Sequence, residues 1–142
     1  MSEKEKFVKL TVDGEAYIAE LERGENGSLL DGFYRALSCE SIEVVNVRRD
    51  LQDVYGVPFR MIVDEMGKCR TGWTDRINYH ATATCSSFTD LIVGDVLIGK
   101  LEAVNEDGEL DIVGLTDREL SHFFVSLFQT GVHVDFADCM FE

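Results

Sequence analysis

The sequence contains a single proline, Pro58, and no run of serine or glycine that could serve as a flexible linker. No apolar stretch reaches the roughly 20 residues that a membrane-spanning helix requires. The first six residues, MSEKEK, are charged where a secretory signal would need an apolar segment. A chain of 142 residues can bury one hydrophobic core. We therefore expect one domain over residues 1–142, disordered at most in its first six residues, that is cytoplasmic and has no membrane partner.

Cysteine pairs are also missing. The four cysteines are far apart in the sequence and none belongs to a C-x-x-C pair: Cys39, Cys69, Cys85 and Cys139. Structural zinc sites usually take their ligands in close pairs, and disulfide frameworks are typical of short secreted chains. We therefore expect reduced, mostly buried thiols and neither a metal nor a cofactor.

Common catalytic motifs are absent as well. The sequence has no G-x-x-x-x-G-K-[ST], G-x-G-x-x-G, G-x-S-x-G or H-E-x-x-H. These patterns supply phosphate-binding amides, a serine nucleophile or zinc ligands in the commonest enzymes. His80 and Cys85 could in principle form a thiolate pair, but no family-specific signature surrounds them. We therefore expect a protein that is not an enzyme.

Cations are scarce, with 13 lysines and arginines against 27 carboxylates and a net charge of −14. The excess is concentrated in the C-terminal third, where residues 90–142 hold 12 carboxylates and two cations. Such a field repels phosphate backbones and anionic membranes. Direct nucleic acid binding is therefore not expected.

Short strands and two helices are indicated by the residue patterns. FVKLTVDGEAYIAELE alternates around Asp13-Gly14 and predicts a hairpin, and SLLDGFYRALS then predicts a short helix. SIEVVNV, VPFRMIVDE, LIVGDVLIGKLEAV and ELDIVGL have strand composition, and the third of these should be central, with a bend or bulge at Gly94 or Gly99. CRTGWTDRINYHATATCSSF has no sustained period and predicts a loop or a short helical turn.

The C-terminal helix has the strongest signal. Thr116 and Glu119 form a capping box, and apolar residues then repeat at helical spacing up to a stop at Gly131: Leu120, Phe123, Phe124, Leu127 and Phe128. VHVDF follows as a possible edge strand that could support a homodimer. The fold class we expect is α+β: a mixed, mainly antiparallel sheet, packed on one face by the C-terminal helix, with the shorter first helix nearby.

One segment, VNEDGELDIVGLTDREL, carries six carboxylates and one cation between Val104 and Leu120. Asp117 and Glu119 fall in the first turn of the predicted helix, where the backbone dipole favours negative charge. The other four have no such local reason and are the candidate partner-binding residues: Glu106, Asp107, Glu109 and Asp111. A solvated acidic surface that only maintains solubility would explain the same residues.

The order of features resembles an uncharacterised family. SIEVV, VDEMGK, Asp75-Arg76, DLIVG and GELDIVGLTDREL follow one another over about residues 29–120, and this order resembles small proteins of phages and conjugative elements of Gram-positive bacteria. The family is known as domain of unknown function thirty-eight forty-six. Its members often carry Gly-Leu-Pro-Leu-Asn-Arg in the middle loop, where this chain has residues 71–76 and keeps the final arginine, Arg76. The resemblance implies a mobile-element accessory role and assigns no chemistry.

Two functional hypotheses follow. In the first, the acidic C-terminal surface engages a basic site on a host protein, as a mimic of DNA phosphates would in countering a defence enzyme. In the second, a loop with cationic and aromatic side chains sequesters a nucleotide-like ligand through Arg70, Trp73, Arg76 and Tyr79. In that loop, the simpler possibility is that the arginines neutralise nearby carboxylates and Trp73 covers the core.

Overall fold

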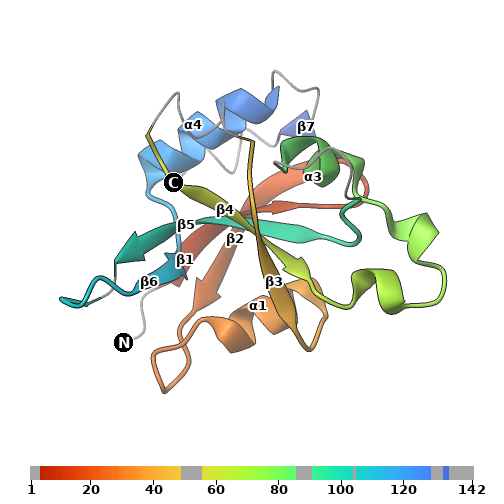
Figure 1. Cartoon of the computed structure of the whole chain (residues 1–142). Coiled ribbons are helices and arrows are strands. Elements are labelled where there is room, and N and C mark those ends of the chain that lie inside the picture. The colour runs from red at the N-terminus through yellow and green to blue at the C-terminus, as the bar shows by residue number, and fades with distance from the viewer. Residues whose placement is uncertain (1–3, 49–55, 86–90, 104, 129–132, 135–142) are drawn as a thin grey trace.

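A computed structural model describes residues 4–48, 56–85, 91–103, 105–128 and 133–134 of the chain (Figure 1). Its strands are β1 (Lys4–Leu10), β2 (Glu15–Glu22), β3 (Ile42–Asn46), β4 (Phe59–Asp64), β5 (Val96–Ala103), β6 (Leu110–Val113) and β7 (His133–Val134). Its α-helices are α1 (Leu30–Leu37), α3 (Tyr79–Thr84) and α4 (Asp117–Phe128). Two short 3-10 helices lie between β4 and α3, η1 (Gly67–Cys69) and η2 (Trp73–Arg76). The predicted α+β fold class is confirmed.

The strands form one sheet in the order β3-β4-β5-β1-β2-β7, and β6 also pairs with β5. All pairs are antiparallel except β2 with β7, so the sheet is mixed and mainly antiparallel as predicted. β5 is the central strand. On one side it pairs with β4; on the other, its first half pairs with β1 and its second half with β6.

Gly99 lies where β5 changes partner from β1 to β6. A Cβ atom there would lie 2.7 Å from Cε2 of Phe7 and 2.8 Å from the carbonyl oxygen of Val113. The predicted bend belongs instead to Gly94, which has a φ of 86° and precedes the strand. Glycine is therefore needed at one position for backbone conformation and at the other for close packing.

The alternation of side chains along the strands divides the core into two layers. On one face, Val96 and Ile98 of β5 pack with α3 and α4; on the other, Leu97 packs with α1. Figure 1 shows α3 and α4 on the side of the sheet opposite to α1. We expected the first helix near the C-terminal helix. The structure places it on the other face of the sheet, because its apolar side chains pack against that face.

α4 begins with the predicted capping box. The backbone amide of Thr116 donates to Glu119 Oε1 at 2.8 Å, and the amide of Glu119 donates to Thr116 Oγ1 at 3.2 Å. Leu120, Phe123 and Phe124 are buried against the sheet, and Phe123 stacks edge-to-face on Phe59 with 5.0 Å between ring centroids. The predicted helix end at Gly131 lies outside the described residues.

Other predicted elements have mixed outcomes. The hairpin around Asp13-Gly14 is confirmed as β1 and β2, with a φ of 85° at Gly14. The irregular middle segment folds as two 3-10 helices followed by the six-residue helix α3. Of the expected C-terminal strand, His133 and Val134 form β7 beside β2, and residues 132, 135 and 136 lie outside the described part. β1 begins at Lys4, inside the segment for which disorder was expected.

Candidate functional site

The predicted partner-binding residues lie on the hairpin formed by β5 and β6. The two strands pair from Lys100 opposite Val113 to Ala103 opposite Leu110. Figure 1 shows this hairpin projecting from one end of the sheet, beyond the helices. Its carboxylates are consequently carried away from the packed core.

Asn105 shapes the connection between the two strands. Its Oδ1 accepts hydrogen bonds from the amides of Asp107 (3.0 Å) and Glu109 (3.2 Å), and its Nδ2 donates to Glu109 Oε2 at 2.8 Å. Gly108 follows with a φ of 78°, which a side chain would disfavour. The backbone amide of Gly108 also donates to the carbonyl oxygen of Asn105 at 3.2 Å, so the side chain and the backbone of Asn105 together hold the loop that carries the acidic side chains.

Glu106, Asp107, Glu109 and Asp111 are all exposed, and we call these four residues the acidic hairpin. Within the described part of the chain, none of them forms an ion pair. Asp111 lies directly opposite Glu102 on β5, so two like charges face each other across the ladder. Such a pair destabilises a sheet unless a cation from elsewhere joins it.

The two remaining carboxylates of this segment are neutralised within the molecule. Asp117 lies 3.2 Å from Lys6 Nζ, and Glu119 lies 2.9 Å from Lys100 Nζ. Burial acts to raise the pKa of Glu119, but the amide hydrogen bond from Thr116 and the Lys100 ammonium outweigh it and hold the pKa below its usual value. Lys100 Nζ lies 4.0 Å from Glu102 Oε1, farther than from Glu119, so the ammonium group acts mainly on the helix carboxylate and only weakly on Glu102. The six carboxylates thus divide into two that have lysine partners and four that form no ion pair with the residues that the structure describes.

The middle loop assembles only part of the second candidate site. Arg70, Trp73 and Arg76 line one hollow of about 110 Å³, whereas Tyr79 is 69% exposed and is not among its lining residues. Arg70 donates to Asp64 Oδ2 through Nε at 3.1 Å and lies 2.9 Å from it through Nη2. This cation therefore neutralises a carboxylate of the protein itself. Arg76 forms no ion pair among the described residues.

A buried residue that the sequence analysis did not single out organises the neighbouring segment. Asn78 is fully buried, and its Nδ2 donates to the carbonyl oxygens of Leu10 (3.1 Å) and Gly94 (3.0 Å). Its Oδ1 accepts from the amide of Ala81 at 2.9 Å and caps α3. An asparagine before a helical stretch is a local sign of a cap, but its contacts with β1 and Gly94 depend on the fold.

Two of the four cysteines, Cys39 and Cys85, are buried as expected. Cys69 is exposed, and Cys139 lies outside the described residues. Burial, together with the nearby Asp64 carboxylate, raises the pKa of the Cys39 thiol.

Among the residues that the structure describes, no three His, Cys, Asp or Glu side chains are grouped as a metal site would require. No helix in this part is long and apolar enough to span a membrane.

Comparisons with known proteins give a fold likeness only. No family model matches the chain, and no curated protein matches its sequence. The resemblance to the phage and mobile-element family therefore stays a prediction. A crystal structure of the small RNA methyltransferase HEN1 superposes with a TM-score of 0.59 at 16% identity, over 87% of this chain. This chain spans only 16% of that protein, so the likeness concerns the fold of one part of it.

Proposed function

We propose that this protein is a non-enzymatic accessory protein that uses the acidic hairpin to bind a basic site on another protein. The observation that carries the proposal is the contrast among the six carboxylates of residues 104–120. Asp117 and Glu119 have lysine partners in the fold, and the four residues of the acidic hairpin have none among the described residues. Unpaired charge of one sign on a projecting element attracts a partner of opposite charge and speeds its association.

An apolar side chain lies between the acids. Leu110, between Glu109 and Asp111, is 63% exposed. Interfaces draw much of their affinity from a few desolvated anchors that are surrounded by polar residues. Leu110 would supply such an anchor, and the carboxylates would orient the partner around it.

The partner we propose is a host protein whose basic surface normally contacts DNA. Carboxylates spaced along a ribbon can satisfy the lysines and arginines that bind phosphates. The resemblance to proteins of phages and conjugative elements points to a cytoplasmic defence enzyme as the target. Direct nucleic acid binding does not fit a net charge of −14, although the structural neighbour is a methyltransferase of small RNA.

Neutralising the acidic hairpin tests this function. The variant Glu106→Gln, Asp107→Asn, Glu109→Gln and Asp111→Asn should bind a captured basic host protein at least tenfold more weakly in 0.1 M salt. The measurement is affinity capture from a bacterial lysate at low and high salt, followed by titration of each captured protein. Duplex DNA should compete with the wild-type protein for the same partner.

A matched control separates the acidic hairpin from the overall charge. The variant Asp13→Asn, Glu25→Gln, Asp31→Asn and Glu40→Gln removes the same number of charges from exposed positions on other elements. It should keep wild-type affinity and a steep salt dependence. Equal binding by the wild type and the hairpin variant would contradict the proposal.

A second candidate function rests on Arg76. Its guanidinium group lies beside Gly94, 3.8 Å from the position of a Cβ atom there, at the hollow that Trp73 also lines. A hollow of about 110 Å³ is smaller than a typical cofactor site of roughly 300 Å³ or more, but it can hold a phosphate-sized group. A nucleotide would therefore place one phosphate in the hollow and its base on the exposed part of Trp73.

Thermal melting with a panel of linear and cyclic nucleotides tests this candidate. A ligand at 100 times its dissociation constant should stabilise the wild type by about 2.7 kcal/mol, and the rise in Tm should disappear in Arg76→Ala. Arg35→Ala, which removes an exposed cation from α1, should retain the rise. If no nucleotide raises the Tm of the wild type, the middle loop is not a nucleotide site.

A further inference from the structure

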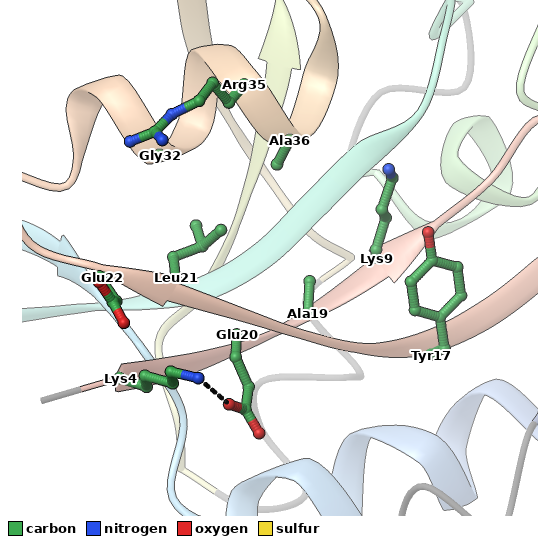
Figure 2. A pocket seen from close by; sticks show the side chains of 10 residues that line it. All are labelled: Lys4, Lys9, Tyr17, Ala19, Glu20, Leu21, Glu22, Gly32, Arg35 and Ala36. Carbon is green, nitrogen blue, oxygen red and sulfur yellow. Dashed lines mark ion pairs between the residues drawn. The ribbon is translucent and has the colours of Figure 1, made fainter.

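A hollow lies where α1 meets the strands β1 and β2 (Figure 2). Its volume of about 510 Å³ falls within the range of roughly 300–1,000 Å³ that small-molecule sites occupy. We call it the α1 hollow. The residues that line it next to the helix are Lys9, Tyr17, Ala19, Leu21, Gly32, Arg35 and Ala36.

Successive side chains of β2 line the α1 hollow from opposite sides of the strand. Figure 2 shows Ala19 and Leu21 directed toward α1, and Glu20 and Glu22 directed away from it. On that other side, Glu20 Oε2 lies 3.8 Å from Lys4 Nζ. Neither carboxylate therefore points into the part of the hollow next to the helix.

The charged side chains that line the part next to α1 are both cations. Lys9 is opposite Tyr17 in the strand register, and Figure 2 shows the two side chains together at one end of the hollow. Lys9 Nζ lies 3.7 Å from Asp95 Oδ2, which balances its charge. Arg35 of α1, at the other end, forms no ion pair with the residues that the structure describes. Its guanidinium group is thus available to a ligand anion.

Small apolar residues form the surface between these two ends. Ala19 and Ala36 are partly buried and pack against the core layer under α1, to which Leu21 also belongs. Gly32 faces the same leucine, since a Cβ atom there would lie 3.5 Å from Cβ of Leu21. Alanine and glycine leave this surface low and apolar, which suits the flat face of an aromatic ring.

We propose that the α1 hollow binds a small aromatic carboxylate. Arg35 binds the carboxylate through two parallel N–H groups, the geometry in which a planar guanidinium group recognises this anion best. The aromatic body covers Ala19, Leu21 and Ala36, and the Tyr17 ring closes the other end. This site is separate from the acidic hairpin and from the middle loop, so it depends on neither function proposed above.

The charges of the hollow favour one negative charge on the ligand. Arg35 is a single unpaired cation in a protein of net charge −14, so a multiply charged phosphate would be repelled more than it is compensated. An uncharged aromatic molecule would cover the same apolar surface but leave the guanidinium group to water. A monocarboxylate satisfies both parts of the hollow.

Titration with 2-naphthoate, followed through the NMR signals of alanine methyl groups, tests the proposal. The signals of Ala19 and Ala36 should shift with a dissociation constant of about 1 mM, as expected for a ligand of this size. Ala103, exposed on β5, should not shift and is the internal control. The neutral analogue 2-naphthamide should bind at least tenfold more weakly, because it has nearly the same shape without the charge.

Arg35→Ala removes the carboxylate partner from an exposed position, so the variant should fold as the wild type does. It should bind 2-naphthoate at least tenfold more weakly and 2-naphthamide about as well as the wild type. Arg35→Lys should recover part of the loss, because it restores the charge without the planar fork. Arg118→Ala, which removes an exposed cation from α4, is the matched control and should keep wild-type affinity.

Three results would overturn the proposal. If neither methyl signal shifts up to the solubility limit of 2-naphthoate, the hollow does not accept such a ligand. Equal affinity of the wild type and Arg35→Ala, or equal affinity of the wild type for the acid and the amide, would show that Arg35 does not recognise the anion. A larger shift at Ala103 than at Ala19 would place the ligand elsewhere.

Discussion

At the scale of single residues, Asn78 joins three segments that are distant in the sequence. Its carboxamide donates to β1 and to the turn before β5, and it accepts from the first turn of α3. Each of these hydrogen bonds is buried, so no water would replace the side chain if it were removed. The residue therefore stabilises the fold beyond the capping of one short helix.

Asn78→Ala should lower the free energy of unfolding by about 3 kcal/mol, because it leaves two carbonyl groups and one amide buried without partners. Urea denaturation measures the loss. Asn26→Ala is the matched control, since Asn26 accepts one exposed hydrogen bond from the Ser28 amide. Its cost should stay near 0.5 kcal/mol. Equal losses in the two variants would show that the Asn78 network contributes little.

Glu119 links the start of α4 to β5, and its contribution depends on pH. Because the folded state holds the pKa of Glu119 below its usual value, the stabilisation is present at neutral pH and is lost as the pH falls through the folded pKa. Glu119→Gln should therefore cost about 1 kcal/mol at pH 7 and progressively less in acid.

A double-mutant cycle with Lys100→Met checks that the Lys100 ammonium is involved. The double variant should cost less at pH 7 than the sum of the single variants. Additive losses would assign the effect to the amide hydrogen bond from Thr116 alone, and a cost of Glu119→Gln that does not change with pH would contradict the lowered pKa.

At the scale of elements, the apolar periodicity of α4 predicted the helix but not its position on the sheet. The capping box and the apolar spacing predicted a helix over this stretch, and the structure places it from Asp117 to Phe128. The same pattern could not show which sheet face the helix covers, because both faces of the sheet are apolar. The face that α4 covers is set by the pairing of the strands. In β5, the side chains of Val96 and Ile98 point toward α4, and the side chain of Leu97 points toward α1.

Phe124→Asp should lower the free energy of unfolding by about 4 kcal/mol, because it removes a fully buried ring and buries a charge in its place. Thermal or chemical denaturation measures the change. The neighbouring Val125 is 49% exposed, so Val125→Asp should cost less than about 1 kcal/mol and controls for helix propensity and charge. A stable Phe124→Asp protein would contradict the packing of α4.

At the scale of the whole molecule, the net charge of −14 should destabilise the folded state, because like charges repel one another. With 27 carboxylates and 13 lysines and arginines, we expect repulsion among like charges to exceed the attraction within the ion pairs. The structure reduces this repulsion near α4, where Lys6 and Lys100 are committed to carboxylates, and leaves it on the acidic hairpin.

The Tm of the wild type should therefore rise by several degrees between 0.02 and 0.3 M sodium chloride, because salt screens the repulsion. The variant with a neutral acidic hairpin should melt higher at low salt and gain less from added salt. Calorimetry over this range checks both. A Tm that falls with salt would show that the ion pairs outweigh the repulsion.

The sequence by itself determined the local features of this protein: the hairpin at Asp13-Gly14, the capping box at Thr116, the strand composition and the excess of acid after residue 90. These depend on residues that are near one another along the chain. Only the tertiary structure decided that Arg70 is paired with Asp64, that Tyr79 does not line the hollow of Trp73, and that Lys6 and Lys100 neutralise two of six carboxylates. Each of those contacts joins residues whose distance is set by strand order and helix placement, which no local pattern encodes.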